Sequence, residues 1–165
     1  MIVPPSPPEP LADHHQLDRF NCGVSSLDLW LQRRARANQA SDASRTYVVC
    51  DGNRVVAYYA LASGSIAVED APGRFRRNMP QPIPAVILGR LAVDTSLHGQ
   101  GIGRALFRDA ATRVLNAAST IGIRGIVVHA ISEEARRYYL ALGFAAGPRD
   151  PFVLMVTLAD LRANL

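Results

Sequence analysis

The alternation of apolar and polar positions along the chain predicts an α/β fold. Apolar residues recur at helical spacing in residues 25–39, which predicts a helix that Ser25 caps, with Asp28 three positions later. Turn-forming residues at 51–53 separate two apolar runs and predict a hairpin. The expected strands are residues 46–50, 55–63, 85–93, 125–130 and 152–158, and two further helices are expected, one after residues 98–103 and one over residues 132–144. This order predicts a single domain in which helices flank a mixed central β-sheet.

The size and composition of the chain limit the class of protein. Its 165 residues fit one domain, and 48% hydrophobic against 19% charged residues indicates a globular chain. We expect residues 1–10, half of them proline, to be extended, and residues 11–165 to form the domain. No apolar run approaches the ~20 residues that span a membrane, and the N-terminus does not resemble a secretory signal. We therefore expect a cytoplasmic protein without a membrane partner.

Cysteine and charge narrow the possible sites. Cys22 and Cys50 are far apart, with no Cys-x-x-Cys motif and no nearby histidine pair, so we expect neither a metal site nor a disulfide framework. All 18 basic residues are arginine, and the positive charge concentrates in residues 19–90. A basic face suits a polyanionic partner, although a net charge of +4 is equally compatible with an ordinary solvated surface.

Residues 98–103, His-Gly-Gln-Gly-Ile-Gly, form a glycine-rich turn between a buried strand and a helix. A helix N-terminus offers unpaired backbone N–H groups and the positive end of the helix dipole, so a phosphate or pyrophosphate is the expected ligand. A Walker loop is excluded because the chain has no lysine, and the glycine spacing does not fit a dinucleotide fingerprint. A tight turn without a ligand is the alternative.

The expected helix over residues 132–144 is capped by Ser132, ended by Gly143 and carries two adjacent tyrosines, Tyr138 and Tyr139. Adjacent helical positions point about 100° apart, so one ring can pack in the core while the other faces a cleft. Most helical tyrosines are structural, so a chemical role needs further support.

Two motifs together resemble the signatures of the GCN5-related N-acetyltransferases (GNAT). Residues 100–105 match Q/R-x-x-G-x-G/A, and residues 135–144 match A-x-x-x-Y-x-x-x-G-F. Further segments, with residues 20–31 the most discriminating, resemble the TacT-type GNAT toxins of bacterial toxin–antitoxin pairs. The resemblance covers roughly residues 11–158.

The resemblance implies a reaction and its residues. Such toxins use acetyl-CoA to acetylate the α-amino group of an aminoacyl-tRNA, which stops translation, and a cognate antitoxin, expected to be of the ribbon-helix-helix type, neutralises them. Tyr139 falls at the catalytic tyrosine of the family, and Ser132 stands where an asparagine often contacts the cofactor. The other cofactor contacts are expected from the main chain of Leu91, Ala92 and Val93 and from the pyrophosphate loop, His98, Gly99, Gln100, Gly101, Ile102, Gly103 and Arg104.

The chemistry of acetyl transfer agrees with this assignment. A phenol near the sulfur can protonate the departing CoA thiolate, which suits Tyr139. Many GNAT enzymes place a basic glutamate on the fourth strand, whereas the corresponding strand here, 85–93, has Arg90 and no acid. An α-amine, with a pKa of about 7.7–8.0 or lower when its carboxyl is esterified, is largely neutral without a base, unlike a lysine at about 10.4. Glu69 or Asp70 could still act as the base through water.

Arginine forks suit phosphate backbones, and six arginines are candidates for binding the tRNA. They lie on the first helix, on an exposed loop expected over residues 70–84, and on the strand 85–93: Arg33, Arg34, Arg36, Arg76, Arg77 and Arg90. One alternative is a GNAT enzyme that acetylates a small amine or a protein N-terminus. Another is a non-enzymatic module that has kept the CoA pocket or binds an antitoxin and operator DNA, but the presence of both the glycine-rich loop and Tyr139 argues against it. The sequence does not identify the aminoacyl-tRNA, and it leaves open whether the chain forms a homodimer.

Overall fold

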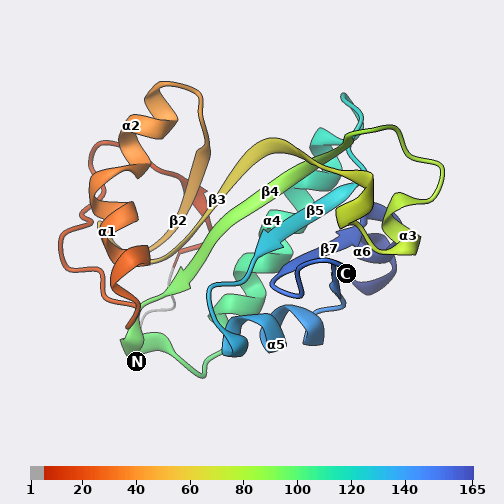
Figure 1. Cartoon of the computed structure of the whole chain (residues 1–165). Coiled ribbons are helices and arrows are strands. Elements are labelled where there is room, and N and C mark those ends of the chain that lie inside the picture. Colours follow the sequence, from red (N-terminus) through yellow and green to blue (C-terminus); the bar gives the residue numbers. More distant parts are fainter. Residues whose placement is uncertain (1–5) are drawn as a thin grey trace. The chain divides into compact units, whose positions relative to one another are not determined.

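A mixed β-sheet of seven strands, in the order β1-β2-β3-β4-β5-β7-β6, forms the framework of the computed structural model (Figure 1). The structure describes residues 6–165, so half of the proline-rich segment expected over residues 1–10 lies outside the described residues. The strands are β1 (Glu9–Pro10), β2 (Arg45–Asp51), β3 (Arg54–Ile66), β4 (Ile83–Val93), β5 (Gly125–His129), β6 (Ala145–Ala146) and β7 (Val153–Thr157). The helices are α1 (Ser25–Arg33), α2 (Ala35–Ala40), α3 (Gly73–Arg76), α4 (Ile102–Ala117), α5 (Glu133–Ala141) and α6 (Leu158–Asn164).

The chain divides into two compact units. The first unit comprises Met1–Ala62 and Arg90–Ala110, and the second comprises Ser63–Gly89 and Ala111–Leu165. The chain therefore passes from one unit to the other within β3, β4 and α4. Among the described residues, no helix is long and apolar enough to span a membrane.

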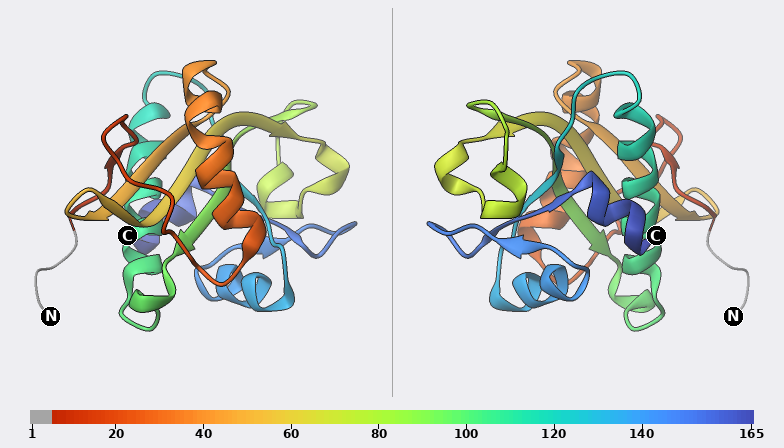
Figure 2. Two further views of the ribbon diagram at one scale, coloured as in Figure 1. Left: turned by 90° about the vertical axis from the view of Figure 1, so that its left-hand side faces the viewer. Right: turned by 90° about the vertical axis from the view of Figure 1, so that its right-hand side faces the viewer.

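The first unit packs helices on both faces of β3. Consecutive strand residues point to opposite faces, and Tyr58 and Tyr59 show this directly. The hydroxyl of Tyr58 donates to the carbonyl of Leu27 in α1 at 2.7 Å, whereas that of Tyr59 donates to Asp109 in α4. Figure 2 shows α1 and this part of α4 on opposite sides of the strand. Both tyrosines are fully buried, so they anchor the two helices to the centre of the unit.

The expected helix over residues 25–39 is in fact two helices, and this expectation was wrong in two details. The backbone breaks at Arg34, with φ −122° and ψ −29°, and α2 then directs Arg36 and Gln39 to the carbonyls of His15 and Leu11. Ser25 does not cap the first helix, because Val24 occupies the cap position without a side-chain hydrogen bond.

In the second unit, β5 pairs with β7 and the helices α3, α5 and α6 contact β7. The loop expected to be exposed over residues 70–84 instead contains the helix α3, and three of its apolar residues, Ala71, Phe75 and Ile83, are buried. Gly125 shows how closely this core is packed: a Cβ there would lie 1.9 Å from the carbonyl oxygen of Val156. The prediction failed because the prolines and arginines of the segment are typical of an exposed loop, whereas its three buried residues form no regular apolar pattern.

A buried carboxylate holds the end of β4 in the first unit. Asp94 is 2% exposed and accepts hydrogen bonds from the backbone N–H groups of Asn21 and Ser96, both at 3.1 Å, and from the Ser96 hydroxyl at 2.8 Å. A guanidinium nitrogen of Arg54 lies 3.4 Å away. Burial alone would raise the pKa of Asp94, but these donors outweigh it and hold the pKa below its ordinary value.

Replacing Asp94 with Asn should lower the free energy of unfolding by about 2–3 kcal/mol at pH 7, because the amide NH₂ would face donors. The advantage of the wild type should be complete above the ordinary carboxyl pKa of about 3.9 and should shrink as the pH falls through the lower native pKa. Urea titrations at several pH values measure this difference, with the exposed Asp18→Asn as the control. A difference between wild type and Asp94→Asn that does not change with acidity would contradict the assignment.

Candidate active site

The glycine-rich loop in the first unit has the conformation that an anion site needs. Gly99 and Gly101 have positive φ angles of +78° and +79°, which only glycine adopts without strain, and a Cβ at either position would meet no atom within 4 Å. The carbonyl of Gly101 accepts the N–H of Ala105, so α4 begins here, and Gly103 lies in its first turn. The N–H groups of this first turn have no partner within the helix and can bind phosphate oxygens.

His98 holds this loop to the end of β4. Its Nε2 lies 2.7 Å from the carbonyl oxygen of Val93, which leaves only Nδ1 for a ligand. Leu91 and Val93 are half-buried, and the side chain of Ala92 lies in the core that α1 covers. The structure therefore brings the predicted strand and loop residues together in one segment of the first unit.

Arg90, the residue before this segment, lies over an aromatic ring. Its guanidinium carbon is 4.5 Å from the centroid of the Trp30 ring in α1. The Trp30 ring in turn stacks on that of Tyr58, with 6.0 Å between centroids and an interplanar angle of 8°. No local sequence pattern indicates this contact, because Trp30 and Arg90 lie 60 residues apart in the chain.

Within the second unit, the parallel pairing of β4 with β5 covers Val86↔Ile126 and Ile87↔Val127. β5 continues to His129, yet Leu88 and Gly89 have no register partner in it among the described residues of this unit. Within this unit, the paired register therefore ends at Ile87 of β4 and Val127 of β5.

Tyr139 lies on α5 in the second unit and is the more buried of the two adjacent tyrosines, with 8% exposure. Its ring packs edge-on against Tyr138 and Phe144, each at 5.3 Å between centroids. Gly143 has a φ of +104°, which turns the chain at the end of α5 and brings Phe144 back to Tyr139. Burial, and to a lesser extent the neighbouring Tyr138, raises the pKa of Tyr139, so the phenol keeps its proton at neutral pH.

Ser132 has the predicted capping role. Its hydroxyl accepts the N–H of Ala135 at 3.1 Å, and its backbone is extended, as in other N-cap residues. Any contact with a cofactor would have to share this hydroxyl with the cap.

The candidate arginines differ in whether the guanidinium already donates a hydrogen bond within the protein. Arg33 and Arg34 are exposed at the end of α1, and Arg76 and Arg77 are exposed at the end of α3. Arg36 donates to the carbonyl of His15 at 2.5 Å, so its guanidinium holds α2 to the preceding loop. Arg33 and Arg34 belong to the first unit, and Arg76 and Arg77 to the second.

The two acids considered as a base form ion pairs on the surface of the second unit. Arg149 lies 4.0 Å from Glu69 and 3.4 Å from Asp70, and Gln81 also donates to Glu69. Both carboxylates are therefore already paired with the same arginine on the surface of this unit.

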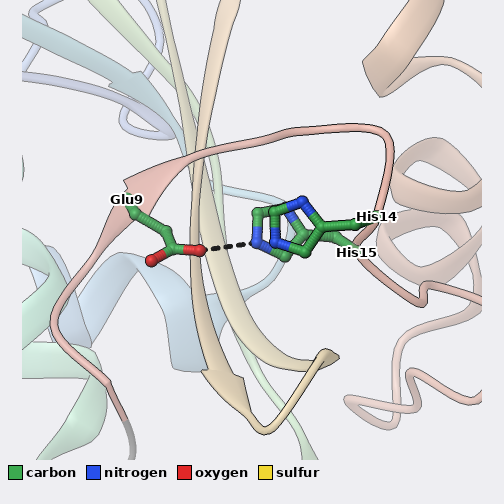
Figure 3. Close-up of side chains that lie close together, drawn as sticks. All are labelled: Glu9, His14 and His15. Carbon is green, nitrogen blue, oxygen red and sulfur yellow. Dashed lines mark hydrogen bonds and ion pairs between the residues drawn. The ribbon is translucent and has the colours of Figure 1, made fainter.

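A separate cluster of Glu9, His14 and His15 has potential metal ligand atoms within 4.8 Å of one another (Figure 3). Nδ1 of the buried His15 accepts the N–H of Ala12 at 2.9 Å, so Nε2 carries the ring proton and donates to Glu9 at 2.6 Å. A metal on Nε2 would have to displace this proton. The hydrogen bond between His15 and Glu9 therefore has a structural role: it joins the loop that follows β1 to β1 itself.

Comparison with known proteins identifies the family. The family model described as "Acetyltransferase (GNAT) domain" matches residues 42–146, which span the glycine-rich loop and the tyrosine motif. The chain belongs to the GNAT acetyltransferase family. It is 48% identical to a tRNA-acetylating toxin of Mycobacterium tuberculosis strain H37Rv, over 96% of this chain and 95% of that protein. It is also 30% identical to a probable toxin TacT of Sinorhizobium fredii strain NGR234, over 94% of this chain and 92% of that protein.

Solved structures of similar proteins include three complexes of AtaT. AtaT with acetyl-methionyl-tRNAfMet matches this acetyltransferase with a TM-score of 0.87 and 30% identity, over 94% of this chain and 96% of that one. AtaTR with acetyl-CoA matches with a TM-score of 0.80 and 32% identity, over 94% and 95%. The AtaT–AtaR complex bound to DNA matches with a TM-score of 0.77 and 31% identity, over 94% and 97%.

Replacing Gly101 with Ala should weaken acetyl-CoA binding about five- to thirtyfold, because its φ of +79° costs an L-residue roughly 1–2 kcal/mol and the loop would relax away from the pyrophosphate. Gly52 is a matched control: it also has a positive φ, +66°, and open space at Cβ, but it lies in the β2–β3 turn. Calorimetry on Gly101→Ala and Gly52→Ala measures both affinities. Equal affinities in the two variants would remove the loop from the cofactor site.

Proposed function

We propose that this acetyltransferase is a toxin that transfers the acetyl group of acetyl-CoA to the α-amino group of an aminoacyl-tRNA and so blocks translation. Its likeness over nearly the whole chain to a tRNA-acetylating toxin carries this proposal. The structure of the similar AtaT with acetyl-methionyl-tRNAfMet, the acetylated product, supports the same acceptor. The absence of an acid from β4 agrees with an acceptor amine that is neutral without a base.

The first unit supplies the groups that would hold acetyl-CoA. The loop from His98 to Arg104 would bind the pyrophosphate through backbone N–H groups at the start of α4, and Leu91, Ala92 and Val93 would bind the pantetheine arm through their main chain. The open space at Gly99 and Gly101 fits a group with phosphate oxygens close to the backbone. Bound acetyl-CoA supplies an activated thioester carbonyl for the amine to attack.

Tyr139 would act as the general acid. Its phenol is protonated at neutral pH because burial raises its pKa, so it can donate a proton to the sulfur of the leaving group. The neighbouring Phe144 and Gly143 fix the ring, which explains why the three residues occur in one motif. Ser132 would contribute mainly by starting α5 at the correct residue.

The partners of the protein follow from the same likeness. An antitoxin is proposed because a variant of the similar toxin AtaT has been solved bound to the C-terminus of the antitoxin AtaR. We propose that it is of the ribbon-helix-helix type and that the two act in the cytoplasm. A homodimer of the toxin stays a prediction that sedimentation analysis would test.

Purified wild-type protein should acetylate bulk aminoacyl-tRNA with acetyl-CoA, and Tyr139→Phe should reduce the rate by ~10²–10⁴-fold while leaving acetyl-CoA affinity nearly unchanged. The substitution keeps the ring packing and removes only the hydroxyl. Tyr138→Phe is the neighbouring control and should stay active. Wild-type protein that acetylates a small amine or a protein N-terminus but no aminoacyl-tRNA would disprove the proposal, and an active Tyr139→Phe would show that the tyrosine is wrongly assigned.

Binding of charged tRNA should weaken as salt rises, with a slope of about −0.9 per duplex phosphate contacted or −0.7 on a single strand. Replacing Arg76 and Arg77 together with Ala should flatten this slope by about one to two units and leave acetyl-CoA affinity unchanged. The control replaces Arg137 and Arg162 together with Ala. Both are exposed arginines of the same unit, so the two double variants lose the same net charge. If both double variants changed the slope by the same amount, Arg76 and Arg77 would have no specific role.

A further inference from the structure

Arg90 is a positive charge on β4 with an unusual environment. It is half-buried, and its guanidinium lies 4.5 Å above the Trp30 ring. Within the described residues, none of the ion pairs involves Arg90. A partly buried charge without a carboxylate is costly, so its retention on a strand calls for an explanation.

The support beneath Arg90 is rigid. The Trp30 ring stacks on Tyr58, which is fully buried and tethered through its hydroxyl to the carbonyl of Leu27. A guanidinium stacked on an aromatic ring keeps its plane and its charge while its N–H groups stay available at the edge. The structure thus fixes a permanent cation on the face of β4 that α1 covers.

The place of this cation along β4 follows from the proposed function, on which the next step rests. The pyrophosphate would lie on the loop that follows β4, and the pantetheine arm would run along residues 93 to 91. The thioester end of the cofactor would then reach toward Arg90. The acceptor amine must approach this same end.

We propose that Arg90, held on Trp30, is a specificity-determining residue that disfavours the protonated form of the acceptor amine. A nearby positive charge lowers the pKa of an amine by opposing the ammonium form. The α-amine of an aminoacyl ester, already close to neutrality, would lose its proton to water, whereas a lysine amine would stay an ammonium and be rejected. The neutral amine then forms the C–N bond, the C–S bond breaks, Tyr139 protonates the sulfur, and the proton lost by nitrogen restores Tyr139.

The effect of Arg90 on the protonation of the acceptor amine has to be separated from the titration of neighbouring groups. Asp28 of α1 accepts the N–H of Cys22 at 2.9 Å. Burial raises the pKa of the Cys22 thiol to about 11 and that of the Tyr58 phenol further, so neither titrates between pH 6 and 9. His98 lies at the far end of the strand segment, where its Nε2 contacts the carbonyl oxygen of Val93. Further charged groups of this unit are Arg54 and Asp94, which pair with each other, and Arg104, Arg108 and Asp109 on α4.

The test compares two ligands that differ only in the amine. One is an RNA acceptor-stem helix with an aminoacyl group on a hydrolysis-resistant 3′-amide, and the other carries the matching hydroxyacyl group. Their affinities are measured without acetyl-CoA from pH 6 to pH 9. In the wild type the ratio of amine to hydroxyl affinity should rise about tenfold over this range, because a pKa lowered by one unit corresponds to a tenfold preference for the neutral amine. Arg90→Met should flatten the rise, and Arg90→Lys should retain part of it.

Several results would overturn the inference. They are a flat ratio in the wild type, a rise that survives in Arg90→Met, and a rise that His98→Gln removes. Equal weakening of both ligands by Arg90→Met, with the rise unchanged, would make Arg90 a phosphate contact. If Arg90→Met does not fold, the wild-type ratio decides. A wild type that does not acetylate aminoacyl-tRNA would disprove the proposed function itself, whereas an active wild type with a flat ratio would disprove only the role of Arg90.

Discussion

The buried carboxylate of Asp94 is the interaction on which the geometry of the first unit depends. It lies where β4 ends, and its own N–H bonds to Val56 of β3 while its carbonyl accepts Leu97. A carboxylate this deeply buried is tolerable only because backbone amides, a hydroxyl and Arg54 replace the water around it. These bonds fix the residue at which strand geometry stops, and so they set the start of the glycine-rich loop and of α4.

The same carboxylate explains residues 20–31, the segment that distinguished this sequence most clearly. Asn21 bonds to Asp94 through its N–H and to Thr95 through its carbonyl, and Phe20 packs edge-on against Tyr58 at 5.4 Å. Cys22 donates its N–H to Asp28 of α1 at 2.9 Å. The segment therefore joins the end of β4 to α1, and the position of Trp30 under Arg90 follows from this joint.

Sequence patterns predicted the turns and helix ends that depend on a few neighbouring residues. The hairpin turn at Gly52, the cap at Ser132, the end of α5 at Gly143 and the glycine-rich turn before α4 each depend on a few consecutive residues, and the sequence predicted all of them as structural features. The split between α1 and α2 and the burial of Phe75 depend on partners far along the chain. So does the contact of Arg90 with Trp30, 60 residues earlier. A single sequence has no periodicity that encodes such pairs, so it singled out Arg90 as a candidate but could not reveal the ring that supports it.

The proposed chemistry relies on two groups whose charges do not change near neutral pH. The raised pKa of Tyr139 keeps its proton available for the leaving sulfur, and the guanidinium of Arg90 stays charged. β4 offers no carboxylate to accept a proton from the acceptor, and Glu69 and Asp70 are already paired with Arg149. In the proposed chemistry, the protonation state that matters is therefore that of the acceptor itself. A site built in this way favours an amine whose pKa is already low, and esterification of the adjacent carboxyl is the modification that gives an α-amine this property.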